Sequence, residues 1–475
     1  AIERVHANRG FILTTQTPTH AKRAVMDTNV SEEQLLKKNA LPENTNQKQR
    51  DREGNENESE GMNQGRNRAD DPARNEGPKS VQRSSTKRTI PSADQTGEKK
   101  PRHRKKKGKK MFPKKQYGFE TRDEENEDMD VSLLDMPEEE DWILQAPYSD
   151  KSLIRNALIY DISREIGRYA SRVKFVELTL NDVNDGVYVF MEKLKRDKNR
   201  IDINKLKTSE ISGEDLTGGY IIKIDKPDDQ YNSINSFVSE HSPYDPSGNN
   251  SVRFLYDTPD EEDITSEQKE YISNYVKDFE NALAGENFTD PVQGYDAYID
   301  SDDFIDFFLL NELSNNVDGF RISTWIVKDK NEKMRMGPIW DFNLAFGNAD
   351  YCSGGESNVW AYKLNERCPG GFWPIPFWWE RLLQDPAYVL KLKARWTELR
   401  GTAFSNSAMT KMIDNYEMIL RSSGSVKRNF ERWPVLGTYV WPNNYIGSDY
   451  SDEINFIRNW ISERLSWLDS NIASL

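Results

Sequence analysis

The chain has 475 residues and a formal net charge of −14, but its charge is divided unevenly along its length. Residues 1–115 contain 27 Lys or Arg and 15 Asp or Glu, a net of +12, so the remaining residues carry −26 and hold all 12 Trp. A body this acidic is poorly suited to nucleic acid, because contacts to a phosphate backbone depend on cationic side chains. No run of about 18 apolar residues occurs, so no transmembrane segment is predicted.

Residues 1–108 are predicted to form a disordered, low-complexity basic arm. They contain neither Trp nor Tyr and few aliphatic residues, so they cannot bury enough apolar surface to offset the entropy of ordering them. We therefore expect no β-strands upstream of about residue 105. The run Lys99–Lys110 could by itself bind nucleic acid, anionic lipid or an acidic surface, or it could be a solvated tail.

Residues 109–225 are predicted to form a small lobe of strands around one helix. Alternating apolar residues indicate the strands, and apolar residues three to four positions apart indicate the helix, which Ser149 or Asp150 can cap. The turn residues Asn181–Asp185 join two of the strands as a hairpin. The predicted elements are, in chain order, strand Lys115–Phe119, helix Lys151–Gly167, and strands Val173–Leu180, Gly186–Leu194 and Gly218–Asp225.

Residues 226–264 are interpreted as an insertion or mobile loop, because Asn, Ser and Pro dominate them as far as about residue 250. Residues 265–475 are predicted to form a helical large lobe. Its predicted elements are a helix beyond Thr265, a helix around Phe304–Leu313, the strand pair Ile322–Lys328 and Lys333–Trp340, and three further helices, the last one carrying Ile454–Leu468.

Cys352 and Cys368 are the two cysteines of the chain, and they lie in one Gly-, Pro- and Trp-rich loop. No cluster of His or Cys accompanies them that would indicate zinc. A disulfide bond that closes the loop is the simplest interpretation, and two unrelated buried thiols are the alternative. Because disulfides persist in oxidising compartments, we expect the protein to be secreted or held at the cell surface.

Two aspartates flank the strand pair of the large lobe, Asp318 before it and Asp341 at its end. Phosphoryl transfer needs one carboxylate near the acceptor hydroxyl and another on magnesium, and a β-hairpin can bring both to one cleft. The order of predicted parts, from a strand with lysine to a second aspartate after a hairpin, is also that of a protein kinase. Ordinary turn residues are the alternative interpretation of the two aspartates.

The segment Met336–Gly347, which contains Asp341, resembles the hallmark of the CotH kinase family, a spore coat protein type, as found in its secreted bacterial members. The resemblance covers about residues 111–472, with the motifs in the family's order. The other matching segments are Asn316–Arg321, Gly186–Tyr188 with Glu192, Asp150–Asn156, Gly218–Tyr220, Phe112–Lys115 and Pro376–Trp379.

This resemblance implies an α+β, atypical protein-kinase-like two-lobed fold behind the disordered basic arm. It implies a kinase dependent on ATP and on Mg²⁺ or Mn²⁺, which phosphorylates Ser or Thr of an extracytoplasmic coat or cell-surface protein. Asp318 would be the catalytic aspartate and Asp341 a metal ligand, while Lys115, or else Lys114, would hold the ATP phosphates. The other implied residues are Glu192, Lys223 and Arg155 at the nucleotide, and Asn343 and Ser323 at the metal.

Most of these assignments have a structural alternative. Lys114 and Lys115 could continue the basic run, Lys223 could be an exposed strand lysine, and Glu192 could form a surface salt bridge. Arg155, with its neighbour Asn156, could reach the phosphates or stabilise the lobe. The aromatic cluster is expected to be core rather than a ligand platform, and it comprises Trp373, Phe377, Trp378 and Trp379.

Two departures from the family pattern keep other functions open. Ser323 stands where a protein kinase places an Asn that binds a second metal ion, so Asn343 could supply an oxygen instead. Lys106–Lys110 replaces an Arg-Gly-Ser-Ser-like loop that covers the phosphates in relatives, so ATP binding is expected to be weaker. The alternatives are a pseudokinase or structural surface-assembly protein, and a transferase that moves AMP on the same fold.

Overall fold

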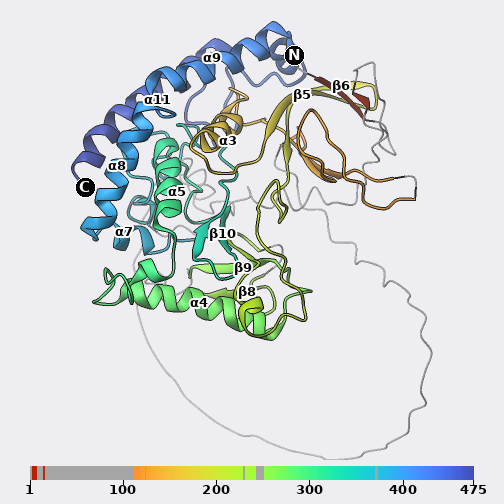
Figure 1. Cartoon of the computed structure of the whole chain (residues 1–475). Coiled ribbons are helices and arrows are strands. Elements are labelled where there is room, and N and C mark those ends of the chain that lie inside the picture. The colour runs from red at the N-terminus through yellow and green to blue at the C-terminus, as the bar shows by residue number, and fades with distance from the viewer. Residues whose placement is uncertain are drawn as a thin grey trace, which may run out of the picture. The chain divides into compact units, whose positions relative to one another are not determined.

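The computed structural model describes the backbone of residues 3–7 and 14–15, and residues 112–123, 125–227, 230–241, 251–369 and 373–475 in full. All of these residues belong to one compact unit, made of residues 1–39 and 111–475. The unit combines helices with two β-sheets (Figure 1), which confirms the predicted α+β class. Apart from two short strands, the predicted disordered arm lies outside the described residues.

The first sheet has six strands in the order β2-β1-β5-β6-β4-β3. Apolar side chains on one face join the main core with α3, whereas the other face has its own cluster around Trp142, Tyr188 and Phe190. The predicted hairpin of β5 and β6 is confirmed, with Val176 opposite Tyr188. The bounds are β3 Tyr117–Glu120, β4 Asp141–Gln145, β5 Val173–Leu180 and β6 Val183–Glu192, with α3 Arg155–Glu165 after β4.

The edge of β5 is covered by β1 (Glu3–Ala7), which runs parallel to it, and β2 (Thr14–Thr15) pairs with β1. The expectation that no strands form upstream of residue 105 is wrong for these two. A strand at this position is made by backbone pairing with an edge far away in the sequence, and local composition does not report that partner.

The second sheet has five antiparallel strands in the order β11-β10-β7-β9-β8. Two of them fall inside residues 226–264, so part of the segment interpreted as an insertion or mobile loop is sheet. Phe254 of β9 is fully buried, and this burial stabilises a strand despite the polar residues around it. The bounds are β7 Tyr220–Ile224, β8 Ser236–Val238, β9 Arg253–Thr258, β10 Thr324–Lys328 and β11 Met334–Met336.

All of the described α-helices except α3 lie within residues 265–475. Figure 1 shows α8, α9 and α11 arranged along one side, and α11 contacts α5, α8 and α9. Thr265 and Gln268 form a capping box at the start of α4, which fixes that predicted helix start. The bounds are α4 Ser266–Ala284, α5 Ser301–Ser314, α6 Leu364–Arg367, α7 Trp378–Leu382, α8 Pro386–Gly401, α9 Asn406–Ser422, α10 Ser425–Arg432 and α11 Tyr450–Ala473.

The predicted disulfide bond is confirmed, and the aromatic cluster is confirmed as core for Trp378 and Trp379, whereas Trp373 and Phe377 are half-buried. Trp378 and Trp379 are fully buried, and the Trp379 ring lies 4.8 Å from that of Phe320, so these aromatics are core. Cys352 and Cys368 form a disulfide bond, with their Cα atoms 5.1 Å apart. Among the described residues, no helix is both long enough and apolar enough to span a membrane.

Candidate active site

Asp318 lies in the loop between α5 and β10, where short-range contacts fix it. Its amide donates to Asn316 Oδ1 over 3.2 Å, and its carbonyl accepts from the amide of Ile322 over 3.1 Å. Its carboxylate accepts a hydrogen bond from Arg321 Nη2 over 3.1 Å, and both side chains are buried. The loop therefore presents the carboxylate of Asp318 from a well-defined turn.

Asp341 follows β11 in a left-handed backbone conformation, with φ at 60°. A non-glycine residue in this region costs roughly 1–3 kcal/mol, and such residues cluster at functional sites. Two side chains of α3 hold the turn: the Asp341 amide donates to Tyr160 Oη over 3.1 Å, and the Phe342 amide donates to Asn156 Oδ1 over 2.8 Å. The strained turn is thus stabilised by a helix distant in sequence.

Arg155 connects the start of α3 to the chain just after Asp341. Its buried guanidinium pairs with Asp150 Oδ1 over 2.6 Å, and it donates to the carbonyls of residues 345–346 over 3.0 and 3.4 Å. Asp150 also accepts from the first amide of α3, close to the capping role predicted for it. These contacts support the structural role of Arg155 and Asn156, and contact with ATP phosphates stays a prediction for Arg155.

The second sheet brings the loops of the two aspartates to the same end of β10, because Asp318 precedes β10 and the antiparallel β11 leads on to Asp341. Burial lowers the pKa of Lys226, whereas the charges of Asp318 and Asp341 act to raise it. Burial also raises the pKa of Tyr351 well above its usual value, and both carboxylates add to that rise. The Tyr351 ring stacks on Trp441, with centroids 6.1 Å apart. A lysine and a tyrosine therefore complete the surroundings of the aspartate pair.

Asn343 fits a metal site beside Asp341. Its Oδ1 atom is buried and has no hydrogen-bond partner within the described residues. Leaving such an acceptor unsatisfied costs about 1–3 kcal/mol, and an oxygen-binding cation would remove that cost. Carboxylate and amide oxygens are ligands that Mg²⁺ accepts. Ser323 lies in the Asp318 loop directly before β10, and its role as a metal ligand stays a prediction.

The lysines predicted to hold the ATP phosphates make other contacts. Lys114 is buried, and its Nζ atom donates to the Val187 carbonyl over 2.5 Å and to Asn429 Oδ1 over 2.9 Å. Burial lowers its pKa to about 7. The ammonium of Lys115 donates to the carbonyl of Phe112. Lys114 thus joins β6 to α10, and the phosphate role of both lysines stays a prediction.

Glu192 and Lys223 also have local partners. The carboxylate of Glu192 is fully buried and pairs with Arg172 Nη1 over 2.7 Å, and the Arg172 side chain is 37% exposed, so the pair runs from the interior to the surface. Lys223 Nζ pairs with Asp257 over 2.6 Å and lies 5.8 Å from the ring centre of Trp325. Their assignment to the nucleotide stays a prediction.

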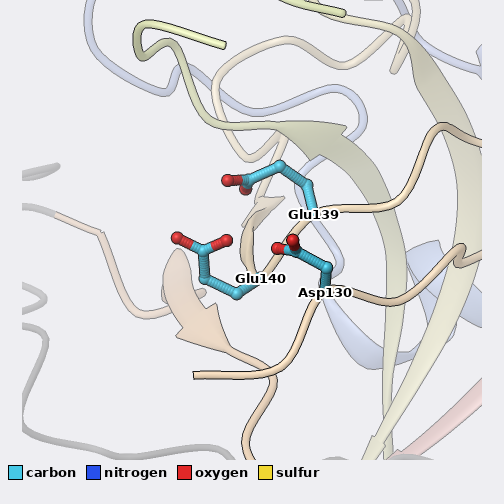
Figure 2. Close-up of side chains that lie close together, drawn as sticks. All are labelled: Asp130, Glu139 and Glu140. Carbon is cyan, nitrogen blue, oxygen red and sulfur yellow. The ribbon is translucent and has the colours of Figure 1, made fainter. Parts of the chain in front are cut away.

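A separate acidic group, shown in Figure 2, comprises Asp130, Glu139 and Glu140. Within the described residues it is the one set of three or more potential ligands whose atoms lie within 4.8 Å of one another. Lys195 Nζ lies 2.6 Å from Glu139 Oε1 and 2.5 Å from Glu140 Oε1, and Arg200 lies 3.0 Å from Glu139. Because the protein's own cations already pair with Glu139 and Glu140, we interpret the group as part of a structural ion-pair network.

A cavity of about 270 Å³ lies behind the segment that leads to Asp341, between α5, β11 and the end of α3. Arg168 and Arg335 line it, but Arg168 is paired with Asp303 and Asp306. Neither Asp318 nor Asp341 lines this cavity, so it is not the site of the aspartate pair.

Sequence reasoning missed Lys226, Tyr160 and Tyr351. Lys226 opens the segment interpreted as an insertion, and the one available signal was its position just after a strand predicted to precede the helical lobe. Tyr160 lies in the predicted helix, where its ring stacks on Trp340 with centroids 6.2 Å apart. Its apolar helical context gave no sign that the hydroxyl supports the Asp341 turn.

Comparisons with known proteins give one family. A family model described as CotH kinase protein matches residues 105–468, which is well over half of the chain. No curated protein is significantly similar to the chain. Among solved structures, the crystal structure of the Helicobacter pylori proinflammatory kinase CtkA matches at 10% identity and a TM-score of 0.29, covering 73% of this chain and 94% of its own.

Proposed function

Because the chain belongs to the CotH kinase protein family, we propose that it is an ATP- and magnesium-dependent protein kinase. Its proposed substrate is Ser or Thr of an extracytoplasmic coat or cell-surface protein. The observation that supports the proposal is that the loops of Asp318 and Asp341 leave the same end of β10 and that both charges act on Lys226 and Tyr351, with the orphaned Oδ1 of Asn343 close to Asp341 in the chain. One carboxylate for the acceptor and one for the metal are what phosphoryl transfer requires.

Each residue has a distinct role in this proposal. Asp341 and Asn343 hold Mg²⁺ or Mn²⁺, which neutralises phosphate charge when it is bound. Asp318 orients the acceptor hydroxyl and accepts its proton as the hydroxyl oxygen attacks the terminal phosphorus of ATP, whose bond to the bridging oxygen breaks so that ADP leaves. Arg321 keeps the Asp318 carboxylate in place through their buried ion pair.

Export of the protein is also part of the proposal. The disulfide bond between Cys352 and Cys368 supports it, because such bonds persist outside the reducing cytosol. The acidic folded body supports a protein acceptor over nucleic acid.

The proposal is tested with the full chain, ATP with Mg²⁺, and dephosphorylated casein as the acceptor. We expect casein to gain the mass of phosphoryl groups on Ser or Thr, measured by mass spectrometry. A gain of adenylyl groups would instead support AMP transfer on the same fold. Absence of both ATP binding and transfer would support the pseudokinase or structural alternative.

Two variants separate metal binding from transfer. Asp341→Asn should abolish the magnesium-dependent part of ATP binding, because a carboxylate ligand is lost. Asp318→Asn should bind ATP nearly as well but transfer phosphate roughly 100- to 10,000-fold more slowly. Asp278→Asn, on the exposed face of α4, is the matched control and should match the wild type. Equal transfer by all three variants would remove both aspartates from the reaction.

A further inference from the structure

Lys226 stands at the end of the second sheet from which both aspartate loops emerge. β7 is antiparallel to β10 and ends where β10 begins, with Ile224 opposite Thr324. Lys226 therefore follows this ladder beside the loop of Asp318. β11 pairs with the other edge of β10, and its chain runs on from the same end to Asp341. Topology alone thus gathers three charged residues at one end of the sheet.

The Lys226 side chain contacts an aromatic ring that is itself fixed by hydrogen bonds. Its Nζ atom lies 5.0 Å from the ring centre of Trp373. Trp373 Nε1 donates to Tyr231 Oη over 3.0 Å, and the Tyr231 hydroxyl donates to the Asp225 carbonyl over 2.6 Å. These contacts return to the residue directly before Lys226, so they restrict the position of its ammonium group. Trp373 therefore supports a charged side chain in addition to the core role expected for its aromatic cluster.

Nearby carboxylates act to keep Lys226 protonated, against the larger effect of its burial. The groups that act on it are Asp318, Asp225 and Asp341, with Arg321 opposing them. Burial is the largest influence and acts against the charged form. Because Lys226 is partly withdrawn from water, the surrounding medium screens the charge of its ammonium group weakly. That charge therefore interacts strongly with neighbouring groups.

The other cations considered for the phosphates have known protein partners. Lys114 and Lys115 bond to backbone carbonyls, Lys223 pairs with Asp257, and Arg155 supports the turn after Asp341. Neither aspartate is among the groups that shift the pKa of Lys114 or Lys115, whereas both act on Lys226.

We propose that Lys226 binds the terminal phosphate of the nucleotide at the site of Asp318 and Asp341. This inference rests on the proposed function and adds the residue that holds the transferred group. Lysine suits this role as a compact donor of hydrogen bonds to phosphate oxygens. Its charge offsets the negative charge that spreads over those oxygens as the phosphoryl group moves. Lys226 forms and breaks no covalent bond in this role, and its ammonium group stays protonated during the transfer.

The test measures calorimetric affinities of the full chain for ATP with Mg²⁺ and for adenosine. Lys226→Met should weaken ATP binding roughly 10- to 100-fold, because a charge-assisted hydrogen bond contributes about 1.5–3 kcal/mol. Adenosine binding should stay within about twofold, since adenosine has no phosphate. Lys226→Arg should recover most of the ATP affinity. Lys411→Met, at an exposed position of α9, is the matched control and should leave both affinities unchanged.

The outcomes separate this inference from the proposed function. If the wild type transfers phosphate and Lys226→Met binds ATP equally well, the inference alone is overturned. An equal loss for ATP and adenosine would show a general structural role and would also overturn it. If Lys226→Met does not fold, the comparison uses Lys226→Gln and Lys226→Arg, and equal ATP affinities of these two would contradict a role for the charge. A wild type that binds no ATP would overturn both proposals.

Discussion

The protonation state of Lys114 is decided by its burial rather than by its neighbours in the sequence. It follows a basic run, yet its ammonium contacts the Val187 carbonyl and Asn429 inside the protein. Its folded-state pKa of about 7 lies below the ordinary value of 10.5, with burial as the main cause and Asp185 opposing it. Below pH 7 both the folded and the unfolded state hold the proton, and the cost of burying the charge is fully present.

Stability should therefore rise with pH above 7 through this residue. Between pH 7 and 10.5 only the unfolded state retains the proton, so the free energy of unfolding gains up to about 1.4 kcal/mol per pH unit. Urea denaturation of the wild type and of Lys114→Met should show their difference shifting in favour of the wild type from pH 7 to pH 9. A difference that is constant with pH would mean that Lys114 stays charged when buried.

Among the elements, α3 connects the first sheet to the site. Three of its side chains, Arg155, Asn156 and Tyr160, bond to the backbone of residues 341–346. Because residues 341 and 346 both adopt left-handed backbone conformations, this segment depends on outside contacts to keep its shape. α3 is thus the element on which the position of Asp341 depends.

Tyr160→Phe tests this dependence by removing one hydroxyl group. The Asp341 amide loses its acceptor, so we expect stability to fall by about 1–3 kcal/mol and magnesium-dependent ATP binding to weaken. Tyr295→Phe is the matched control: its buried hydroxyl donates to Asp385 over 2.6 Å, away from the site. It should lower stability without changing the metal dependence. Identical ATP titrations for both variants would contradict the positioning role of α3.

The elements that could be predicted are those with a clear local period. α3, the hairpin of β5 and β6, and α5 lie within a few residues of their predicted bounds because apolar spacing marks them. β1, β2, β4, β8 and β9 were missed, since each depends on pairing with a strand elsewhere or on burial within a polar segment. Asp318 and Asp341 could be chosen from motifs, whereas Lys226 reaches the site through the register of β7 with β10.

For the molecule as a whole, a buried ion pair links α5 to the C-terminal helix. Glu312 and Arg464 are both fully buried and lie 3.0 Å apart. Glu312 also accepts from the amides of Ala361 and Tyr362, while Arg464 donates to the carbonyls of Ser357 and Val359. The pair therefore joins two helices and the loop that follows the disulfide's first cysteine.

A double-mutant cycle should reveal the coupling of this pair. Arg464→Met or Glu312→Leu alone should cost about 3–5 kcal/mol, because each leaves an uncompensated buried charge. The double variant should cost clearly less than the two single changes together, since neither charge remains. Guanidinium denaturation measures all four proteins, and additive costs would contradict the coupling.

The same pair has a consequence for the history of the fold. Positions 312 and 464 are 152 residues apart, yet we expect a change at either one alone to be more strongly disfavoured than a joint change. In descendants of a common ancestor, the two positions should accordingly covary, either both ionic or both apolar, with mixed pairs rare. The two residues should therefore change together, and the ionic pair should identify the lineages in which this contact between α5 and α11 has been retained.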